Sequence, residues 1–333
     1  MKKTHLNWGF LGAARIGRAL APAIVASRYA RAYAVASRSR DKAETYAREN
    51  GFERSYGSYQ ALLKDPNVDV IYNPLPNHLH CEWTIRALEA GKHVLCEKPM
   101  ALNVAECRRM IAAAKRNDRL LMEAFMYRLH PQTFKLQEII QKGAIGEVRV
   151  IRAGFGFSLN ESAKNVRLAK RKGGGCLMDV GCYCVNAMRT FFRDEPELVA
   201  GQAKRGKISG VDMTFGGVLM FPQGRLGVFT STLQTVLDWG LEIVGTLGRI
   251  SVPSPWKPDG RLASFVLEAN GKREVVQIKN GGGIYHCEVD HFSRCILERK
   301  PLAMPPEEGL KNVRVIEALV NSARRSRAVR VKA

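Results

Sequence analysis

The residues best suited to chemistry lie where two predicted strands end. Glu97-Lys98-Pro99 follows a short apolar run at 93–96, and Leu75-Pro76-Asn77 follows a second run at 68–72. Ligands bind at the carboxyl ends of strands in parallel α/β sheets, so both segments are expected to face one crevice. A lysine there can hydrogen-bond a substrate oxygen, and its charge lowers the pKa of a nearby acid. The pattern predicts a reaction site at Lys98.

A glycine-containing turn lies earlier in the chain. Residues 7–11 form an apolar run typical of a buried strand, and Gly12-x-Ala14-x-x-Gly17 follows where a helix is predicted to begin. Such a helix end offers free N–H groups and partial positive charge to a pyrophosphate. Ala14 replaces the middle glycine of the dinucleotide-binding pattern, and the alternative is an ordinary tight turn. The expected cofactor contacts in this turn are Gly12, Ala14, Arg15, Ile16 and Gly17.

The end of the second predicted strand distinguishes between NAD and NADP. An NAD-binding protein usually has Asp or Glu there, which binds the ribose 2′-hydroxyl. This chain has Ser37 and Arg38, which can bind a 2′-phosphate through charge-assisted hydrogen bonds. The pair therefore favours NADP(H).

The elements that must position these residues fall into two groups. Apolar runs at 7–11, 32–36, 68–72, 93–96 and 120–122 alternate with predicted helices, which indicates an α/β domain with a parallel sheet. We assign this Rossmann domain to residues 1–128, and an α+β domain to residues 129–333. The predicted strands of the second domain are 147–155, 199–205, 212–221, 224–233, 239–244, 249–252, 264–269 and 273–277. Its predicted helices are 133–142, 180–191, 288–298 and 307–324.

The bulk composition is that of a globular, two-domain protein. The chain has 333 residues, of which 46% are hydrophobic and 25% charged, and a single core rarely grows past about 250–300 residues. No apolar run approaches the roughly 18–20 residues that a membrane span needs. The first residues lack the apolar segment of a signal peptide, so we expect a cytoplasmic protein that does not enter the membrane.

The net charge of +21 is the least ordinary number. It could serve nucleic-acid binding, the attraction of an anionic ligand, or only solubility. The basic residues are spread along the chain and no nucleic-acid motif accompanies them, so no specific nucleic acid is expected. Cys182 and Cys184 lack a second ligand pair at zinc spacing, and we expect no metal.

These segments together resemble the Gfo/Idh/MocA oxidoreductase family throughout the length of the chain. The matching stretches are residues 9–17, 75–77, 90–99, 173–183 and 306–310. The resemblance implies a second domain with an open antiparallel sheet, through which many members pair into dimers or larger oligomers. The further cofactor contacts expected on this basis are Leu75, Pro76, Asn77, His80, Glu97 and Lys98.

One departure points to a branch of the family. Members usually carry D-x-G-x-H with a catalytic histidine, whereas this chain reads Asp179-Val180-Gly181-Cys182-Tyr183. Tyrosine in that place is similar to the glucose–fructose oxidoreductase, NADP-dependent xylose dehydrogenase and dihydrodiol dehydrogenase branch. The resemblance implies that Tyr183 is the acid/base and that Lys98 is its electrostatic partner. Asp179 would orient Lys98 or hold a substrate hydroxyl.

The expected activity is hydride transfer between NADP(H) and a small carbohydrate-like substrate, an aldose, keto-sugar or polyol. One alternative is a dihydrodiol dehydrogenase or a reductase of a non-sugar carbonyl. Another is an NADP-sensing regulatory protein without turnover, which would need neither Lys98 nor Tyr183. The weaker candidates for substrate contacts are Arg128, Asn165, Arg167 and Tyr285.

Overall fold

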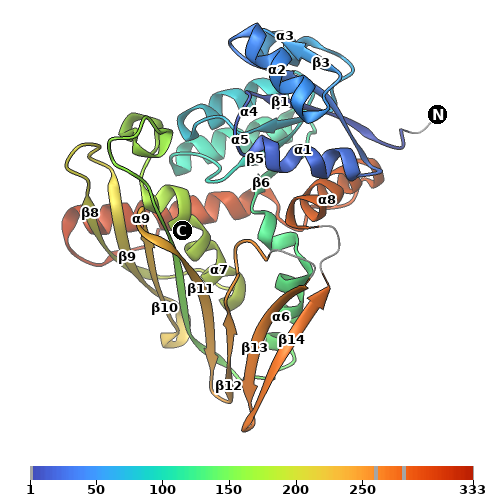
Figure 1. Cartoon of the computed structure of the whole chain (residues 1–333). Coiled ribbons are helices and arrows are strands. Elements are labelled where there is room, and N and C mark those ends of the chain that lie inside the picture. The colour runs from blue at the N-terminus through green and yellow to red at the C-terminus, as the bar shows by residue number, and fades with distance from the viewer. Residues whose placement is uncertain (1–2, 259–261, 280–282, 333) are drawn as a thin grey trace. The chain divides into compact units, whose positions relative to one another are not determined.

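The computed structural model describes residues 3–258, 262–279 and 283–332. The chain divides into two compact units (Figure 1). Unit 1 comprises Met1–Leu129 and Gly282–Leu310, and unit 2 comprises His130–Gly281 and Lys311–Ala333. The predicted boundary after residue 128 lies one residue from the observed division. A late segment, which was predicted to belong to the second domain, is grouped with unit 1.

That segment is held by an apolar helix face. Helix α8 (Ile284–Glu298) packs against α1 (Gly17–Ala26). Phe292 of α8 meets Trp8 edge to face, with ring centroids 6.0 Å apart, and the indole N–H of Trp8 donates to Ser293 Oγ at 3.3 Å. Trp8 and Phe292 are fully buried, so α8 completes the core of unit 1.

Unit 1 is built on a six-stranded parallel sheet of order β3-β2-β1-β4-β5-β6, which confirms the predicted Rossmann architecture. Its strands are nearly all buried, because helices cover both faces of such a sheet. The strands are β1 (Leu6–Leu11), β2 (Ala30–Ala36), β3 (Arg54–Tyr56), β4 (Val70–Asn73), β5 (His93–Glu97) and β6 (Leu121–Ala124). Its helices besides α1 and α8 are α2 (Arg40–Asn50), α3 (Tyr59–Lys64), α4 (His80–Glu89) and α5 (Val104–Arg116), with the short turns η1 (Asn77–Leu79) and η2 (Met126–Leu129).

Three of these helices begin at side-chain caps. Ser39, Ser58 and Asn103 each accept a hydrogen bond from the main-chain N–H three residues later. These bonds satisfy N–H groups that have no partner inside the helix. By contrast, the residue before α1, Ile16, supplies no side-chain cap.

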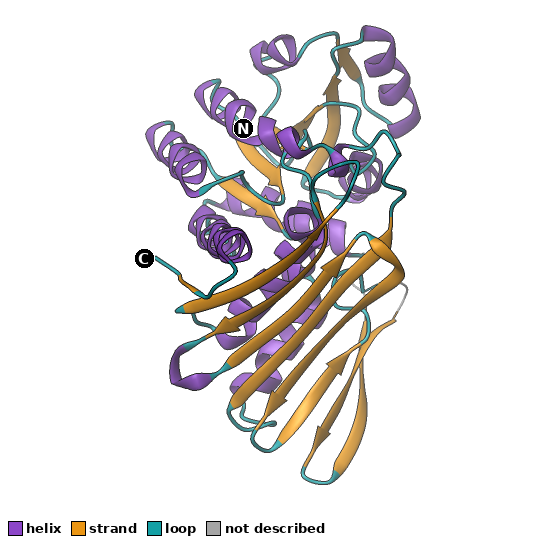
Figure 2. Cartoon of the chain, turned by 90° about the vertical axis from the view of Figure 1, so that its left-hand side faces the viewer, coloured by secondary structure: helices purple, strands orange, loops and turns teal. Residues whose placement is uncertain are grey.

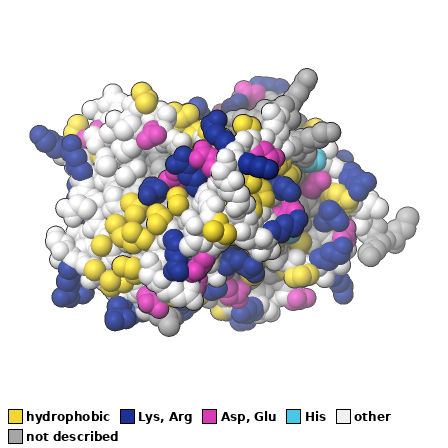
Figure 3. All heavy atoms as spheres, turned by 90° about the horizontal axis from the view of Figure 1, so that it is seen from below, with side chains coloured by type: hydrophobic (Ala, Val, Ile, Leu, Met, Phe, Trp, Pro, Cys, Tyr) yellow, Lys and Arg dark blue, Asp and Glu magenta, His cyan; other side chains and the backbone are white. Residues whose placement is uncertain are grey.

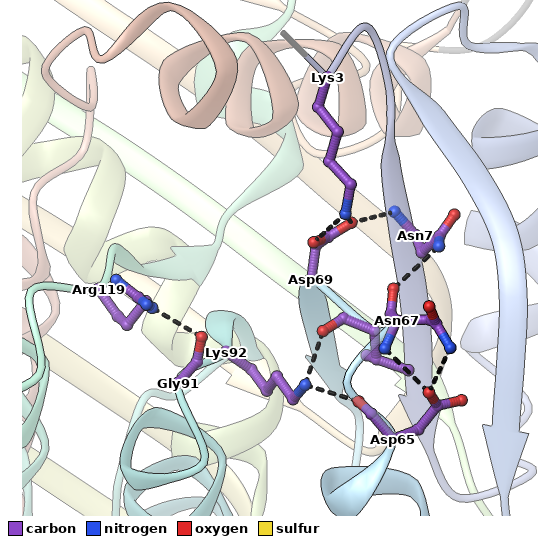
Figure 4. A network of polar contacts seen from close by, with 9 residues as sticks. Lys3, Asn7, Asp65, Asn67, Asp69, Gly91, Lys92 and Arg119 are labelled. Carbon is purple, nitrogen blue, oxygen red and sulfur yellow. Dashed lines mark hydrogen bonds and ion pairs between the residues drawn. The ribbon is translucent and has the colours of Figure 1, made fainter. Parts of the chain in front are cut away.

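The amino-terminal edge of the sheet is closed by a polar network (Figure 4). Lys92 is 5% exposed, and its Nζ donates to two main-chain carbonyls of the loop 65–68 at 2.7 and 2.8 Å. Burial lowers the pKa of Lys92. Asp69 accepts from Lys3 Nζ at 2.5 Å and from the main-chain N–H of Asn7 at 2.9 Å. This network fixes the edge opposite to the strand ends that carry the predicted chemistry.

Unit 2 is built on a nine-stranded sheet of order β14-β13-β12-β11-β7-β10-β9-β8-β15, and only the β10–β7 pairing is parallel among those described. The predicted large, mostly antiparallel sheet is therefore confirmed. The strands are β7 (Val148–Ser158), β8 (Leu198–Arg205), β9 (Asp212–Met220), β10 (Leu226–Thr232), β11 (Gln234–Gly245), β12 (Gly248–Val252), β13 (Leu262–Ala269), β14 (Lys272–Lys279) and β15 (Val329–Arg330).

Helices cover one face of this sheet and leave the other face open (Figure 2). Along β9, Met213, Phe215 and Leu219 are buried, whereas Val218 and Met220 alternate with them and are exposed. The longer helices are α6 (Pro131–Gln141), α7 (Cys182–Phe192) and α9 (Pro306–Arg325), which begins in unit 1 and continues into unit 2. The shorter turns are η3 (Val166–Leu168), η4 (Lys170–Lys172), η6 (Pro222–Gly224) and a π-helical turn, η5 (Leu177–Gly181), before α7.

The predicted elements differ from the observed ones mainly at short or polar segments. β3 and β15 were not predicted, because three and two residues at a sheet edge show no apolar alternation. β11 begins at Gln234, five residues before the predicted start at 239, and its first residues are exposed. The π turn at Leu177–Gly181 precedes the helix that was predicted from 180.

Among the described residues, no helix combines the length and apolar composition needed to cross a bilayer. On the face drawn in Figure 3, Lys and Arg side chains are dispersed and alternate with Asp and Glu side chains. This dispersed pattern agrees with a basic protein whose charge is spread along the chain.

Candidate active site

Three predicted segments meet at the carboxyl ends of adjacent strands of unit 1. From β1 the chain proceeds to β2 and β3 on one side of the sheet, and from β4 to β5 and β6 on the other. Gly12 follows β1, Leu75-Pro76-Asn77 follows β4, and Glu97-Lys98 closes β5. The reversal of strand order between β1 and β4 is where ligands bind in open α/β sheets. The predicted cofactor turn and the predicted reaction site thus belong to one edge.

The glycine turn fits a dinucleotide pyrophosphate. Gly12 has φ +95°, and a Cβ there would lie 3.2 Å from the Leu75 side chain. A Cβ on Gly17 would lie 2.5 Å from Tyr46 Oη, which donates to the Ala14 carbonyl at 3.2 Å. The first turn of α1 has no acidic residue. Its uncapped N–H groups and positive dipole end suit an anionic diphosphate.

The end of β2 carries the residues that could select the cofactor. Ser37 is nearly buried and its Oγ accepts from Ser39 N at 3.3 Å, whereas Arg38 is exposed. Burial raises the pKa of Tyr59, and the charge and hydrogen bond of Arg38 partly oppose this shift. The Tyr59 hydroxyl lies 3.5 Å from the Cβ position of Gly12, so Tyr59 links Arg38 to the glycine turn.

A separate hollow of about 310 Å³ beside the turn is lined by Ala13, Arg18, Asp41, Lys42, Thr45 and Tyr46.

Lys98 is held through the carboxylate that precedes it. Glu97 Oε1 accepts a hydrogen bond from Tyr72 Oη at 2.6 Å, and Glu97 Oε2 accepts from the main-chain N–H of Lys98 at 3.3 Å. Glu97 and Lys98 are both partly exposed. The Glu97 side chain therefore ties the end of β5 to β4 and fixes the main chain at Lys98.

His80 corrects one expectation. It was predicted to contact the cofactor, but its ring is fully buried, with Nε2 2.7 Å from the Leu75 carbonyl and Nδ1 2.9 Å from the Pro99 carbonyl. Burial lowers the pKa of His80 to about 4, so the ring is neutral near pH 7. Both ring nitrogens face main-chain carbonyls, so the buried ring of His80 lies between the loop that carries Leu75 and the loop that carries Pro99.

The predicted catalytic residues of unit 2 lie on one continuous segment. Asp179 is in the π turn, and Tyr183 is in the first turn of α7. Asp179 Oδ2 pairs with Arg167 Nε at 2.6 Å, with side chains 13% and 44% exposed. Asp179 was expected to orient Lys98 or hold a substrate hydroxyl. Arg167 is one partner of Asp179, and both expected roles stay predictions.

An aromatic cluster fixes the ring of Tyr183, which is 5% exposed. Ring centroids of Phe155 and Trp256 lie 5.4 and 5.8 Å from that of Tyr183. The Trp256 N–H donates to the Gly154 carbonyl at 3.0 Å. The ring orientation is thus set by strand β7 and by the segment after β12, and the acid/base role of Tyr183 stays a prediction.

The four weaker candidates divide between the units. Arg128 lies in η2 and Tyr285 at the start of α8, both in unit 1. Asn165 and Arg167 lie in unit 2, where Asn165 Oδ1 accepts from the main-chain N–H of Arg167 at 3.0 Å. This bond caps the short turn η3 and orients the segment that carries Arg167.

Sequence reasoning missed the residues that support the reacting groups. Asp212 Oδ2 accepts from the main-chain N–H of Leu177 at 2.7 Å and from Cys176 Sγ at 3.3 Å. A Cβ on Gly175 would lie 2.0 Å from Asp212 Oδ1, so glycine is needed for this approach. The run of glycines before Cys176 indicated that another group approaches the main chain closely. It did not identify Asp212 as that group.

The fold and the glycine turn define a two-domain oxidoreductase that uses a nicotinamide dinucleotide. A model described as "Oxidoreductase family, NAD-binding Rossmann fold" matches residues 6–125, and the "GFO/IDH/MocA C-terminal domain" model matches residues 134–251. The chain belongs to the Gfo/Idh/MocA oxidoreductase family and is an enzyme of that class.

Named relatives cover nearly the whole chain. It is 34% identical over 325 residues to D-xylose 1-dehydrogenase (NADP(+)) 2 of Haloferax volcanii, covering 97% of this chain and 99% of that one. It is 35% identical over 297 residues to trans-1,2-dihydrobenzene-1,2-diol dehydrogenase of Xenopus laevis, covering 87% and 88%. The crystal structure of aldose-aldose oxidoreductase from Caulobacter crescentus, complexed with glycerol, superimposes with a TM-score of 0.90 at 30% identity, covering 98% and 99%.

The buried ring of His80 predicts acid sensitivity. Its folded-state pKa of about 4 lies below the ordinary value of 6.5, so its contribution is present above pH 6.5 and is lost as pH falls toward 4. We expect a loss of up to about 3 kcal/mol from this group. Thermal unfolding of wild type and His80→Asn between pH 7 and 4 should show the difference in stability narrowing with acid. The exposed His5→Asn variant serves as control, and a constant difference for His80→Asn would contradict the assignment.

Proposed function

We propose that this enzyme is an NADP-dependent oxidoreductase that transfers hydride between nicotinamide and a sugar or sugar-derived carbonyl or alcohol. The observation that carries the proposal is Lys98, held by Glu97 at the carboxyl end of β5 on the edge that also carries the glycine turn. A reacting group on that edge is placed for a dinucleotide-linked reaction.

The preference for NADP rests on the charge at the end of β2. Ser37 and Arg38 stand where a carboxylate would select the 2′-hydroxyl of NAD. A carboxylate would repel a 2′-phosphate, whereas a guanidinium can donate two hydrogen bonds to it. The NADP(+) in the name of the Haloferax volcanii relative agrees with this preference.

In the proposed reaction, different groups transfer the proton and the hydride. The bound nicotinamide supplies or accepts the hydride, while Tyr183 Oη gives a proton to, or takes one from, the substrate oxygen. A free tyrosine has a pKa near 10 and is a poor base at neutral pH. A nearby ammonium favours the phenolate, and we assign that role to Lys98. Asp179, paired with Arg167, would hold a substrate hydroxyl.

The substrate class rests on the relatives. The names of two similar proteins contain D-xylose and aldose, which supports a carbohydrate-like substrate. The Xenopus laevis relative favours a second candidate, oxidation of a dihydrodiol, because its identity to this chain is as high. Lys98 and Tyr183 would serve either reaction. A purely NADP-sensing protein would need neither residue.

We also propose that the open face of the nine-stranded sheet binds a second copy of the chain. The strand register places Leu198, Met220, Leu226, Val150 and Val244 side by side across five strands. All five side chains are at least partly exposed. A contiguous apolar row on an uncovered sheet is typical of an interaction surface.

A test of function is turnover of NADPH and NADH with aldoses, keto-sugars, small dicarbonyls and, in the oxidative direction, the matching alcohols and dihydrodiols. We expect NADPH to be preferred with one sugar class.

Arg38→Ala should weaken NADPH binding by roughly 10- to 100-fold, because it removes a charge-assisted hydrogen bond, and should affect NADH binding little. Arg40→Ala, an exposed neighbour paired with Glu44, is the matched control. Equal loss for both cofactors would reject the 2′-phosphate contact.

The roles of Lys98 and Tyr183 predict non-additive kinetics. Lys98→Ala and Tyr183→Phe should each lower kcat by on the order of a hundredfold while NADPH still binds. If the two residues act as one unit, the double variant should be little worse than the poorer single variant. Single-turnover rates and NADPH titration measure this. Near-normal turnover in either single variant would reject its catalytic assignment.

The dimer proposal is tested by molar mass in solution. Val218→Glu, on the open sheet face, should shift the assembly toward monomer because it places a charge in a desolvated interface. Val25→Glu is the control, since Val25 is an exposed valine of α1 in unit 1. Light scattering after gel filtration gives the mass. A monomeric wild type, or an unchanged mass in Val218→Glu, would contradict the proposal.

A further inference from the structure

The helical segment that carries Asp179 and Tyr183 receives its cap from a distant strand. Its N-cap residue, Cys176, has helical main-chain angles and makes no side-chain hydrogen bond to the first turn. The main-chain N–H of Leu177, one of the groups that have no partner inside a helix, donates instead to Oδ2 of Asp212 at 2.7 Å. Asp212 is the first residue of β9 and lies 35 residues further along the chain. The start of this segment is therefore fixed by the sheet of unit 2.

The approach of Asp212 depends on the two residues before Leu177. Gly175 has φ +116°, a main-chain conformation that favours glycine, and a Cβ there would overlap Asp212 Oδ1. Burial raises the pKa of the Cys176 thiol, so the thiol keeps its proton. The Cys176 Sγ atom lies 3.3 Å from Asp212 Oδ2 and 3.3 Å from the main-chain oxygen of Ser231 on β10. Two adjacent strands of the sheet thus contact the residues that precede the helical segment.

The π turn at 177–181 lies on the same strands. It packs against β7, β9 and β10, and a Cβ on its last residue, Gly181, would lie 2.9 Å from Ser231 Oγ. A π turn holds more residues than a turn of α-helix, so it changes the direction in which the following side chains leave the helix. Tyr183 comes two residues after this turn. The contacts of the turn with β9 and β10 therefore decide where the Tyr183 side chain begins.

We propose that Asp212 is a positioning residue of the reaction: a cap supplied by β9 that holds the first turn of the segment 177–192 on the sheet and so keeps Tyr183 Oη where proton transfer requires it. This inference rests on the proposed function, because it assigns Asp212 a role through Tyr183. Asp212 acts on the main chain at Leu177 and not on the reacting atoms. A displacement of a reacting group by about 1 Å can lower the rate by on the order of a hundredfold.

The experiment compares Asp212→Ala and Asp212→Asn with wild type. Alanine removes the acceptor for the N–H of Leu177, whereas asparagine keeps an acceptor of similar shape without the charge. Asp194→Ala is the matched control, because Asp194 follows the other end of α7, accepts from the main-chain N–H of Glu195 at 2.9 Å and pairs with Arg225. For each protein we would measure amide hydrogen exchange of peptides covering 175–183, the unfolding temperature, the Kd for NADPH, and kcat and KM with NADPH.

Hydrogen exchange needs no substrate, so it tests the cap separately from the proposed function. In Asp212→Ala the peptide 175–183 should exchange on the order of tenfold faster, because the first turn opens more often without its acceptor, while peptides of α9 should be unchanged. Asp212→Asn should lie between wild type and Asp212→Ala, because a neutral acceptor binds an N–H more weakly than a charged one. Asp194→Ala should exchange this peptide at the wild-type rate.

The kinetic effect should fall on kcat. We expect kcat of Asp212→Ala to drop by on the order of tenfold or more, with KM and the Kd for NADPH within about threefold of wild type, because the expected cofactor contacts lie in unit 1. Adding Asp212→Ala to Tyr183→Phe should lower the residual kcat little further, because the hydroxyl that Asp212 positions is already absent. If Asp212 only stabilised the fold, the two losses would multiply.

Two results would overturn the inference. Wild-type exchange of the peptide 175–183 in Asp212→Ala would show that Asp212 does not hold the first turn. Losses that multiply in the double variant would show that Asp212 does not act through Tyr183. A wild type without turnover on any substrate would instead refute the proposed function. If Asp212→Ala does not fold, Asp212→Asn decides by the same measurements, and wild-type exchange and kcat in that variant would overturn the inference.

Discussion

The neutral imidazole of His80 is the interaction on which the reactive edge of unit 1 depends. It lies between the carbonyls of Leu75 and Pro99, and so joins the loop after β4 to the loop after β5. A neutral ring has only one N–H, so one contact is a donated hydrogen bond and the other carbonyl faces an acceptor nitrogen. The ring thus fills the space between the two loops, out of reach of water, and is tied to one of them by a hydrogen bond.

In both units, groups that could react are held by neighbouring side chains or main chain. Tyr72 and the Lys98 main chain occupy both oxygens of Glu97, and Phe155 and Trp256 enclose the ring of Tyr183. Rigid support of this kind keeps reacting atoms within the narrow geometry that proton and hydride transfer demand. The supporting atoms come from strands β4 and β7 and from the segments that follow β5 and β12.

Local patterns were sufficient to predict the alternating elements, the glycine turn and the strand-end placement of Lys98. Each depends on residues that are close in the sequence, and a buried strand or a helix start imposes its pattern over a few positions. The Ser37–Arg38 pair could also be interpreted from the sequence, because that interpretation depends only on the position of the pair after a strand.

Pairings between distant residues could not be predicted. Tyr72 and Glu97 are 25 residues apart, and Phe292 reaches Trp8 only because α8 returns to unit 1. No period in the sequence marks such a contact. For the same reason neither the ion pair between Asp179 and Arg167 nor the burial of the His80 ring was predicted.

The return of α8 also constrains how the protein can be made. Unit 1 is discontinuous: its core lacks Phe292 and Ser293, the partners of Trp8, until residues 130–281 of unit 2 have been synthesised. A fragment ending near residue 129 would expose the surface of β1 and α1 that α8 covers. On the ribosome, the dinucleotide-binding unit therefore completes its core only after strands β7 to β14 of unit 2 have emerged, and unit 2, whose sheet includes β15, is completed later still.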